Sequence, residues 1–222
     1  YRRSFTMVRI LSLFTALVFG TAFSMLASED TKSDAPSSSA DPLPVVEIQS
    51  TVAEENLPTG KRTELGLYLT AREAYEVWVS DPEAVAIIDV RTREEYLFVG
   101  HPAMAWKIPL AQQTYEWDAA KGHYPMKFLP DFVTRVNTIA EPGNTVFVMC
   151  RSGGRSAKAV NMLAEAGFTQ VYNIIDGMEG DKVADPASVY KGQRLVNGWK
   201  NSGCPWTYKP TPERMILTKG KE

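Results

Sequence analysis

Cys150 has the surroundings best suited to chemistry in this chain, because it lies between an apolar run and a glycine-rich loop. The run Thr145 to Met149 is typical of a buried strand, and a helical pattern begins at Arg155. A strand, a tight loop and a helix start point backbone N–H groups at the sulfur, and the helix macrodipole adds positive potential there. Both effects favour the thiolate, which is the nucleophilic form of cysteine.

In a second interpretation Cys150 is only a small core hydrophobe. The loop residues Arg151 to Ser156 argue against it. Gly153 and Gly154 give the backbone the freedom that a tight cradle needs. Arg151 and Arg155 flank a potential anion site. A structural cysteine needs neither feature, so the loop favours a reactive Cys150.

The elements predicted around this loop alternate between strand and helix. A capping box at Thr70 to Glu73 opens a helix that ends at Asp81-Pro82. Helices are also predicted over 130–140, 155–166 and 189–200, with a helical turn at 93–96, strands at 84–90, 105–110 and 170–174, and an irregular segment at 114–126. This order predicts an α/β fold with a mainly parallel central sheet flanked by helices on both faces.

Active sites of parallel sheets lie beyond the carboxyl ends of the strands. Cys150 has that position, and so do Asp89 and Arg91 at the end of the strand predicted over 84–90. The two histidines, His101 and His123, stand in no cluster with metal-ligand spacing. We therefore expect His101 to be structural and His123 to be exposed, and we expect neither a metal nor a cofactor.

The chain has 222 residues and a formal net charge of −2, which argues against a nucleic-acid partner. Three arginines precede the apolar stretch 10–23 and the small residues 24–28, which is the order of a secretory signal peptide. We expect cleavage after Ala27, or alternatively after Ser24, and export to a periplasm. The alternative is an uncleaved membrane anchor. The expected organisation is a signal or anchor at 1–27, a flexible linker at 28–66, a domain at 67–208 and a tail at 209–222.

The chain contains only two cysteines, Cys150 and Cys204. Export invites a disulfide interpretation, but a permanent bridge would consume the thiol that the loop presents. A transient catalytic pairing of the two thiols stays open, and otherwise Cys204 has no part in the chemistry.

Three ordered motifs resemble the signatures of the rhodanese-like domain. The first is Ile88-Asp89-Val90-Arg91 with Glu95-Tyr96, Gly100-His101 and Ile108-Pro109-Leu110. The second is the loop 150–156, and the third combines Gly167-Phe168, Val171 to Ile174 and Gly177 to Gly180. The resemblance extends over about residues 69–206.

The resemblance implies a sulfurtransferase. Cys150 would take a sulfane sulfur from a small anionic donor such as thiosulfate, and a thiol or protein acceptor would remove it. The amides of Arg151, Ser152, Gly153, Gly154, Arg155 and Ser156 would cradle the outer sulfur. Arg155 would hold the loop through Asp89, Arg91 would either support the loop or pair with Glu94 or Glu95, and Arg151 would attract the donor.

Departures from the family pattern and two rival functions stay open. The sequence 100–105 differs from the usual first signature, and residues 115–124 and 181–194 appear inserted. The short loop disfavours phosphatase or arsenate reductase chemistry. The rivals are a non-catalytic carrier or partner-binding module and a thiol–disulfide protein that uses Cys150 with Cys204.

Overall fold

The computed structural model describes residues 48–217, and the structural statements below concern this part of the chain. The segment predicted as a signal peptide or anchor lies outside it. Within residues 48–217 no helix combines the length and the apolar character needed to cross a bilayer.

The centre of the domain is a five-stranded sheet in the order β1-β7-β6-β2-β3, in which every neighbouring pair is parallel. Its strands are β1 (Tyr68–Leu69), β2 (Val85–Asp89), β3 (Trp106–Lys107), β6 (Thr145–Met149) and β7 (Val171–Ile174). A separate antiparallel pair joins β4 (Ala111–Gln113) to β5 (Met126–Phe128). The predicted parallel α/β fold is confirmed.

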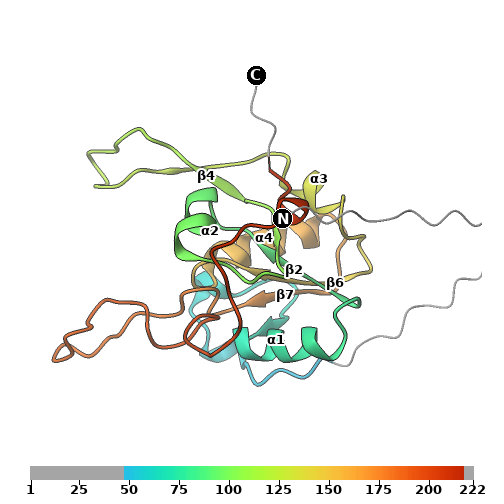
Figure 1. Ribbon diagram of the computed structural model, residues 1–222, viewed down its shortest axis with the longest axis horizontal. Helices are drawn as coiled ribbons and strands as arrows, with labels where there is room; N and C mark the ends of the chain where they lie inside the picture. Colours follow the sequence, from blue (N-terminus) through green and yellow to red (C-terminus); the bar gives the residue numbers. More distant parts are fainter. Residues whose placement is uncertain (1–47, 218–222) are drawn as a thin grey trace, which may run out of the picture. The chain divides into compact units, whose positions relative to one another are not determined.

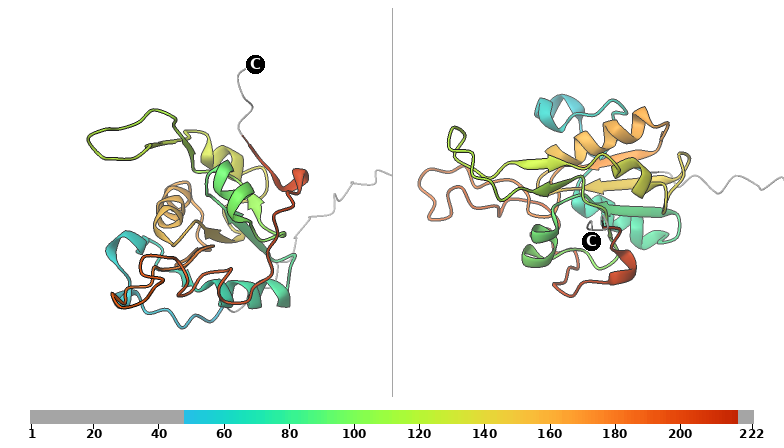
Figure 2. Two further views of the ribbon diagram at one scale, coloured as in Figure 1. Left: turned by 60° about the vertical axis from the view of Figure 1, so that its left-hand side comes forward. Right: turned by 90° about the horizontal axis from the view of Figure 1, so that it is seen from above.

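The helices are α1 (Ala71–Ser80), α2 (Arg93–Val99), α3 (Phe132–Val136) and α4 (Gly154–Glu165). Capping boxes open α1 at Thr70 and α2 at Thr92, so both helix starts follow from local sequence. Figure 1 shows α1 on one face of the sheet and α3 with α4 on the other, and Figure 2 shows the same layers from the side and from above.

Side-chain alternation along β6 divides the core between these two faces. Val146 and Val148 pack with residues of α3 and α4, whereas Phe147 and Met149 pack with residues of α1. Cys150 continues the first set, so its side chain lies on the α4 side of the sheet.

Two predicted helices differ from the structure. The helix predicted over 130–140 is the shorter α3, followed by turns. The helix predicted over 189–200 is wrong, because this segment consists of turns and loops. Gly192 and Gly198 have positive φ values of 83° and 93°, which a right-handed helix does not permit. The apolar side chains of Val189 and Val196 are exposed rather than packed.

Segments on both sides of the expected domain 67–208 pack onto the same unit. Asn173 Nδ2 donates to the carbonyl of Lys61 at 2.9 Å. The N–H of Ile216 donates to the carbonyl of Lys107 at 2.9 Å. The first contact matters for the site, because Asn173 also contacts the cysteine loop.

Candidate active site

Cys150 lies directly after β6 and is almost completely buried, with 2% of its surface exposed. Ser156, in the first turn of α4, donates its hydroxyl to the Cys150 sulfur at 3.4 Å. The predicted strand, loop and helix are therefore present, and the sulfur faces the start of α4. A hydroxyl donor at this distance stabilises negative charge on sulfur.

The loop after Cys150 turns sharply at Gly153, the N-cap of α4, where φ is 93°. A Cβ at this position would collide with the carbonyl oxygen of Ile175, so the turn requires glycine for both its conformation and its space. Gly154 has no such restriction, because the nearest atom to a Cβ there would be the Gly60 carbonyl oxygen at 3.6 Å. The two glycines of the loop thus differ in role.

The carbonyl groups of the loop are held by β7 and by the segment that follows it. Met178 donates its N–H to the Cys150 carbonyl at 2.8 Å, and Glu179 donates to the Arg151 carbonyl at 2.9 Å. Asn173 Nδ2 donates to the Gly153 carbonyl at 3.1 Å. These bonds fix the direction of the loop peptides.

Asp176 fixes the segment that follows β7. Its carboxylate accepts the N–H of Ala71 at 2.7 Å and the N–H of Gly198 at 2.8 Å. Burial raises the pKa of Asp176, and these two N–H donors oppose the rise. The carboxylate therefore ties the start of α1 and the turn at Gly198 to the support of the loop.

The six backbone N–H groups from Arg151 to Ser156 have no hydrogen-bond acceptor among residues 48–217. A helix leaves its first N–H groups without intrahelical partners, and here the loop adds three more. Such a row of donors next to a sulfur atom suits a bound anion or an anionic outer sulfur.

Arg155 pairs with Glu95, and the expectation that it pairs with Asp89 is wrong. Its guanidinium meets the Glu95 carboxylate in two hydrogen bonds of 2.5 and 2.6 Å. Burial alone would raise the pKa of Glu95, but the hydrogen bonds and charge of Arg155 lower it. The pair links α4 to α2, because Glu95 is also the N3 residue of the capping box at Thr92.

Asp89 is instead engaged by Arg91, and both are fully buried. Arg91 Nη2 donates to Asp89 Oδ2 at 2.6 Å and to the carbonyl of Gly100 at 2.7 Å. Burial opposes ionisation of Asp89, but the charges of Arg91 and Lys107 lower its pKa to about 2. Arg91 thus supports the chain around α2 and does not touch the loop carbonyls.

Lys107 is a fully buried cation that the sequence analysis missed. Its ammonium donates to the carbonyls of Asp89 and Arg91 and lies 5.6 Å from the centre of the Tyr96 ring. Burial is the main reason that its pKa falls to about 7. A lone lysine inside the apolar run 105–110 is the signal that could have drawn attention to it.

The other predicted residues have the following places. Arg151 is exposed and has neither an ion pair nor a side-chain hydrogen bond within the described chain. His101 is buried and stacks on Tyr96 with ring centres 3.5 Å apart, as its expected structural role requires. His123 is exposed, also as expected.

Cys204 is buried on the opposite side of the sheet from Cys150. It packs in the core around α1, and its thiol donates to the Ala71 carbonyl at 3.8 Å. Burial raises its pKa to about 11. Both cysteines are free thiols, so the structural disulfide is not formed, and the sheet between them opposes a transient pairing.

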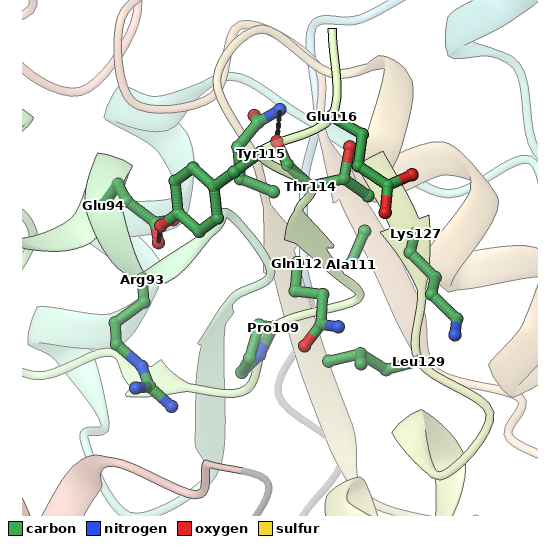
Figure 3. Close-up of a pocket in the computed structure, with 11 residues that line it drawn as sticks. Arg93, Glu94, Pro109, Ala111, Gln112, Thr114, Tyr115, Glu116, Lys127 and Leu129 are labelled. Atoms are coloured by element: carbon green, nitrogen blue, oxygen red, sulfur yellow. Dashed lines mark hydrogen bonds between the residues drawn. The ribbon is translucent and has the colours of Figure 1, made fainter. Parts of the chain in front are cut away.

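A cleft of about 490 Å³ lies beside α2, between Arg93 and Glu94 of that helix and the strands β4 and β5. Figure 3 shows Arg93 and Lys127 on opposite sides of it, with Gln112 between them. Tyr115 closes one wall by donating its hydroxyl to Glu94 at 2.9 Å. The cysteine loop does not line this cleft.

The fold and this loop define an α/β protein with a cysteine at a strand end, followed by six backbone N–H groups that have no acceptor within residues 48–217. A model of the rhodanese-like domain matches residues 71–183, and the chain belongs to that family. An uncharacterized protein of Rickettsia rickettsii is 30% identical over 140 residues, which are 63% of this chain and 96% of that protein.

Two further relatives carry more specific names. Thiosulfate sulfurtransferase 16, a chloroplast protein of Arabidopsis thaliana, is 37% identical over 90 residues, which are 40% of this chain and 68% of that protein. The crystal structure of Rv0390 from M. tuberculosis has a TM-score of 0.50 and 28% identity over 63% of this chain and 96% of that one.

Proposed function

We propose that this protein is a sulfurtransferase that carries sulfur as a persulfide on Cys150. The main support is the six backbone N–H groups from Arg151 to Ser156, which have no acceptor among residues 48–217 and surround the start of α4. These donors suit an anionic sulfur and an anionic donor such as thiosulfate. Arg151, exposed and unpaired among residues 48–217, adds positive charge at the entrance.

The proposed reaction has two balanced steps. The Cys150 thiolate attacks the sulfane sulfur of thiosulfate, a new S–S bond forms, and sulfite leaves with the electron pair of the broken bond. A nucleophilic acceptor then attacks the outer sulfur, and the electron pair returns to Cys150 as a thiolate. With cyanide as the acceptor the product is thiocyanate.

The test is the intact mass of the protein after incubation with thiosulfate, followed by cyanide and a thiocyanate assay. Wild type should gain one sulfur atom and release it as thiocyanate. Cys150→Ser should do neither, whereas Cys204→Ser should behave as wild type because Cys204 packs on the other side of the sheet. An unchanged wild-type mass would count against thiosulfate as the donor.

The proposal includes export, with residues 1–27 as signal peptide or anchor. Its support is the order of arginines, apolar stretch and small residues in the sequence. Fractionation of cells that produce the full chain, with N-terminal sequencing of the product, tests it. A cytosolic product that keeps residues 1–27 would contradict export.

A further inference from the structure

Two insertions stand at the carboxyl edge of the sheet, where Cys150 lies. The hairpin arm consists of residues 111–128, which are β4, β5 and their connection. The loop arm consists of residues 181–196 and begins shortly after β7. Both arms extend from the same side of the domain in Figure 1, and the view from above in Figure 2 agrees.

The hairpin arm touches the helix that begins at the cysteine loop. The Met126 sulfur lies 3.7 Å from Arg155 Nη1, and the Lys158 ammonium lies 5.5 Å from the centre of the Phe128 ring. Tyr115 is bound to Glu94, the neighbour of the residue that holds Arg155. The arm is therefore continuous with the proposed active site.

The loop arm is fixed at its base. Asp181 pairs with Lys61 at 3.0 Å and donates its N–H to Asn197 Oδ1 at 2.7 Å. Arg194 Nη1 donates to the Gly180 carbonyl at 2.5 Å. Because Glu179, two residues before the arm, donates to the Arg151 carbonyl, this arm also begins at the cysteine loop.

Both arms expose large apolar side chains towards solvent. Tyr115, Trp117 and Tyr124 on the hairpin arm have 78%, 57% and 50% of their surface exposed. On the loop arm Val189 and Tyr190 are 86% and 54% exposed. Exposed side chains of this kind on two arms at the same side of a domain are typical of an interaction surface, and aromatic residues supply much of the energy of protein interfaces.

Two exposed cations lie at the start of α4, Arg151 beside the base of the loop arm and Lys158 against the hairpin arm. Arg151 and Lys158 form no ion pair with any residue of 48–217. Arg155, by contrast, is neutralised by Glu95. Charge complementarity therefore favours a partner that carries carboxylates next to its reacting group.

We propose that the two arms dock an acceptor protein whose thiol lies on an acidic segment flanked by apolar side chains. The inference rests on the proposed persulfide on Cys150. A small thiol could reach the sulfur, but it could not span side chains on both arms, so only a protein acceptor would use them.

The transfer step conserves atoms and electrons. The acceptor thiolate attacks the outer sulfur of the Cys150 persulfide and forms a new S–S bond. The bond between the outer sulfur and Cys150 breaks, its electron pair returns to Cys150 as a thiolate, and the acceptor leaves as a persulfide. No oxidant or reductant is consumed.

The test measures how fast four probes discharge the thiosulfate-loaded full chain. The probes are cyanide, glutathione and two single-cysteine peptides of equal length. One peptide carries glutamate, leucine and tryptophan around the cysteine, and the other has lysine in place of glutamate. We expect the acidic peptide to accept sulfur about tenfold faster than the basic peptide or glutathione.

The variant for this test combines Trp117→Ala with Tyr190→Ala, one change on each arm. It should lower the rate with the acidic peptide about tenfold and leave discharge by cyanide unchanged. Val79→Ala is the matched control, because it removes a 51% exposed apolar side chain from the far end of α1.

Each outcome separates the docking proposal from the proposed function. No thiocyanate from wild type would overturn the persulfide itself. Normal thiocyanate with equal rates for both peptides and glutathione would overturn the docking surface and leave the sulfurtransferase intact. Sedimentation could instead show that wild type is a dimer and that the double variant is a monomer. This result would assign the arms to contact with a second copy of the chain and overturn the proposal. If the double variant also loses discharge by cyanide, the docking proposal is decided on wild type alone, from the rates with the acidic peptide, the basic peptide and glutathione.

Discussion

At the scale of single residues, the pair of Arg155 and Glu95 controls where the cysteine loop lies. Arg155 is one residue before Ser156, the hydroxyl donor to Cys150, and its guanidinium is anchored by two hydrogen bonds to α2. A partly buried bidentate pair holds position better than a single contact does, because both groups of the fork must move together. The first turn of α4 therefore keeps its place relative to α2.

Glu95→Gln tests this pair without removing the helix cap, because glutamine keeps an oxygen that can accept the Thr92 N–H. We expect a loss of about 1–3 kcal/mol in the free energy of unfolding, and a decrease of about tenfold or more in sulfur transfer to cyanide. Urea unfolding and the thiocyanate assay measure the two effects. Glu94→Gln is the control, since Glu94 contacts the exposed Tyr115 rather than Arg155. Equal effects of both changes would contradict the assignment.

Lys107 gives the protein a pH-dependent stability. Its pKa is about 7 in the folded protein because of burial, and 10.5 is its ordinary value. Between these values the unfolded chain binds more protons than the folded one, so stability rises with pH, by at most about 1.4 kcal/mol per pH unit. The effect is clearest between pH 7 and 9. Above pH 9 the Cys204 thiol ionises in the unfolded chain but stays protonated in the folded one, where its pKa is about 11, so this group lowers stability as pH rises.

The measurement is the free energy of urea unfolding from pH 7 to pH 9 in wild type and in Lys107→Met. We expect stability to rise in wild type and to stay nearly level in the variant, which has no ammonium to titrate. The same slope in both proteins would show that another group titrates in this window. Lys107→Met also removes the donor to the Arg91 carbonyl. The informative quantity is therefore the slope of the free energy of unfolding with pH, rather than its value at one pH.

At the scale of elements, the start of α4 depends on one glycine more than on the other. Gly153 has a positive φ and no space for a Cβ, whereas Gly154 has space and lies in the helix. Gly153→Ala should destabilise the fold by about 1–3 kcal/mol and reduce sulfur transfer, because the free N–H groups would turn away from Cys150. Gly154→Ala should be neutral or stabilise by up to about 1 kcal/mol. Thermal unfolding and the thiocyanate assay, run on both variants, decide the point, and a reversed order would contradict it.

The elements also show what the sequence could predict. Capping boxes, apolar runs and turn glycines are local signals, so α1, β2, β6, α4 and β7 were predicted close to their observed bounds. The choice between Asp89 and Glu95 as partner of Arg155 depends on how α2 is oriented against α4, which no local pattern encodes. In the segment 189–200 Trp199 packs in the core, but Gly192 and Gly198 have positive φ values and Val189 and Val196 are exposed, so periodicity predicted a helix that does not form.

At the scale of the whole molecule, the described chain divides into a core that holds the cysteine loop and two arms that contribute little to that core. Residues 114–125 contain no buried residue. The ladder between β4 and β5 ends with the pair Gln113 and Met126, on which a short turn can be closed. Stability and persulfide chemistry should therefore belong to the core, and recognition of a large acceptor to the arms.

Replacing residues 114–125 by Asn-Gly tests this division, because Asn-Gly suits a two-residue turn between antiparallel strands. We expect the midpoint of thermal unfolding to change by no more than a few degrees, since a surface loop without buried side chains contributes little to stability. Transfer to cyanide should persist within about twofold, because Met126 stays in place beside Arg155. Loss of cyanide transfer in a folded variant would mean that the hairpin arm shapes the reaction at Cys150 itself. Retained cyanide transfer with slower discharge by the acidic peptide would place recognition on the arm and chemistry on the core.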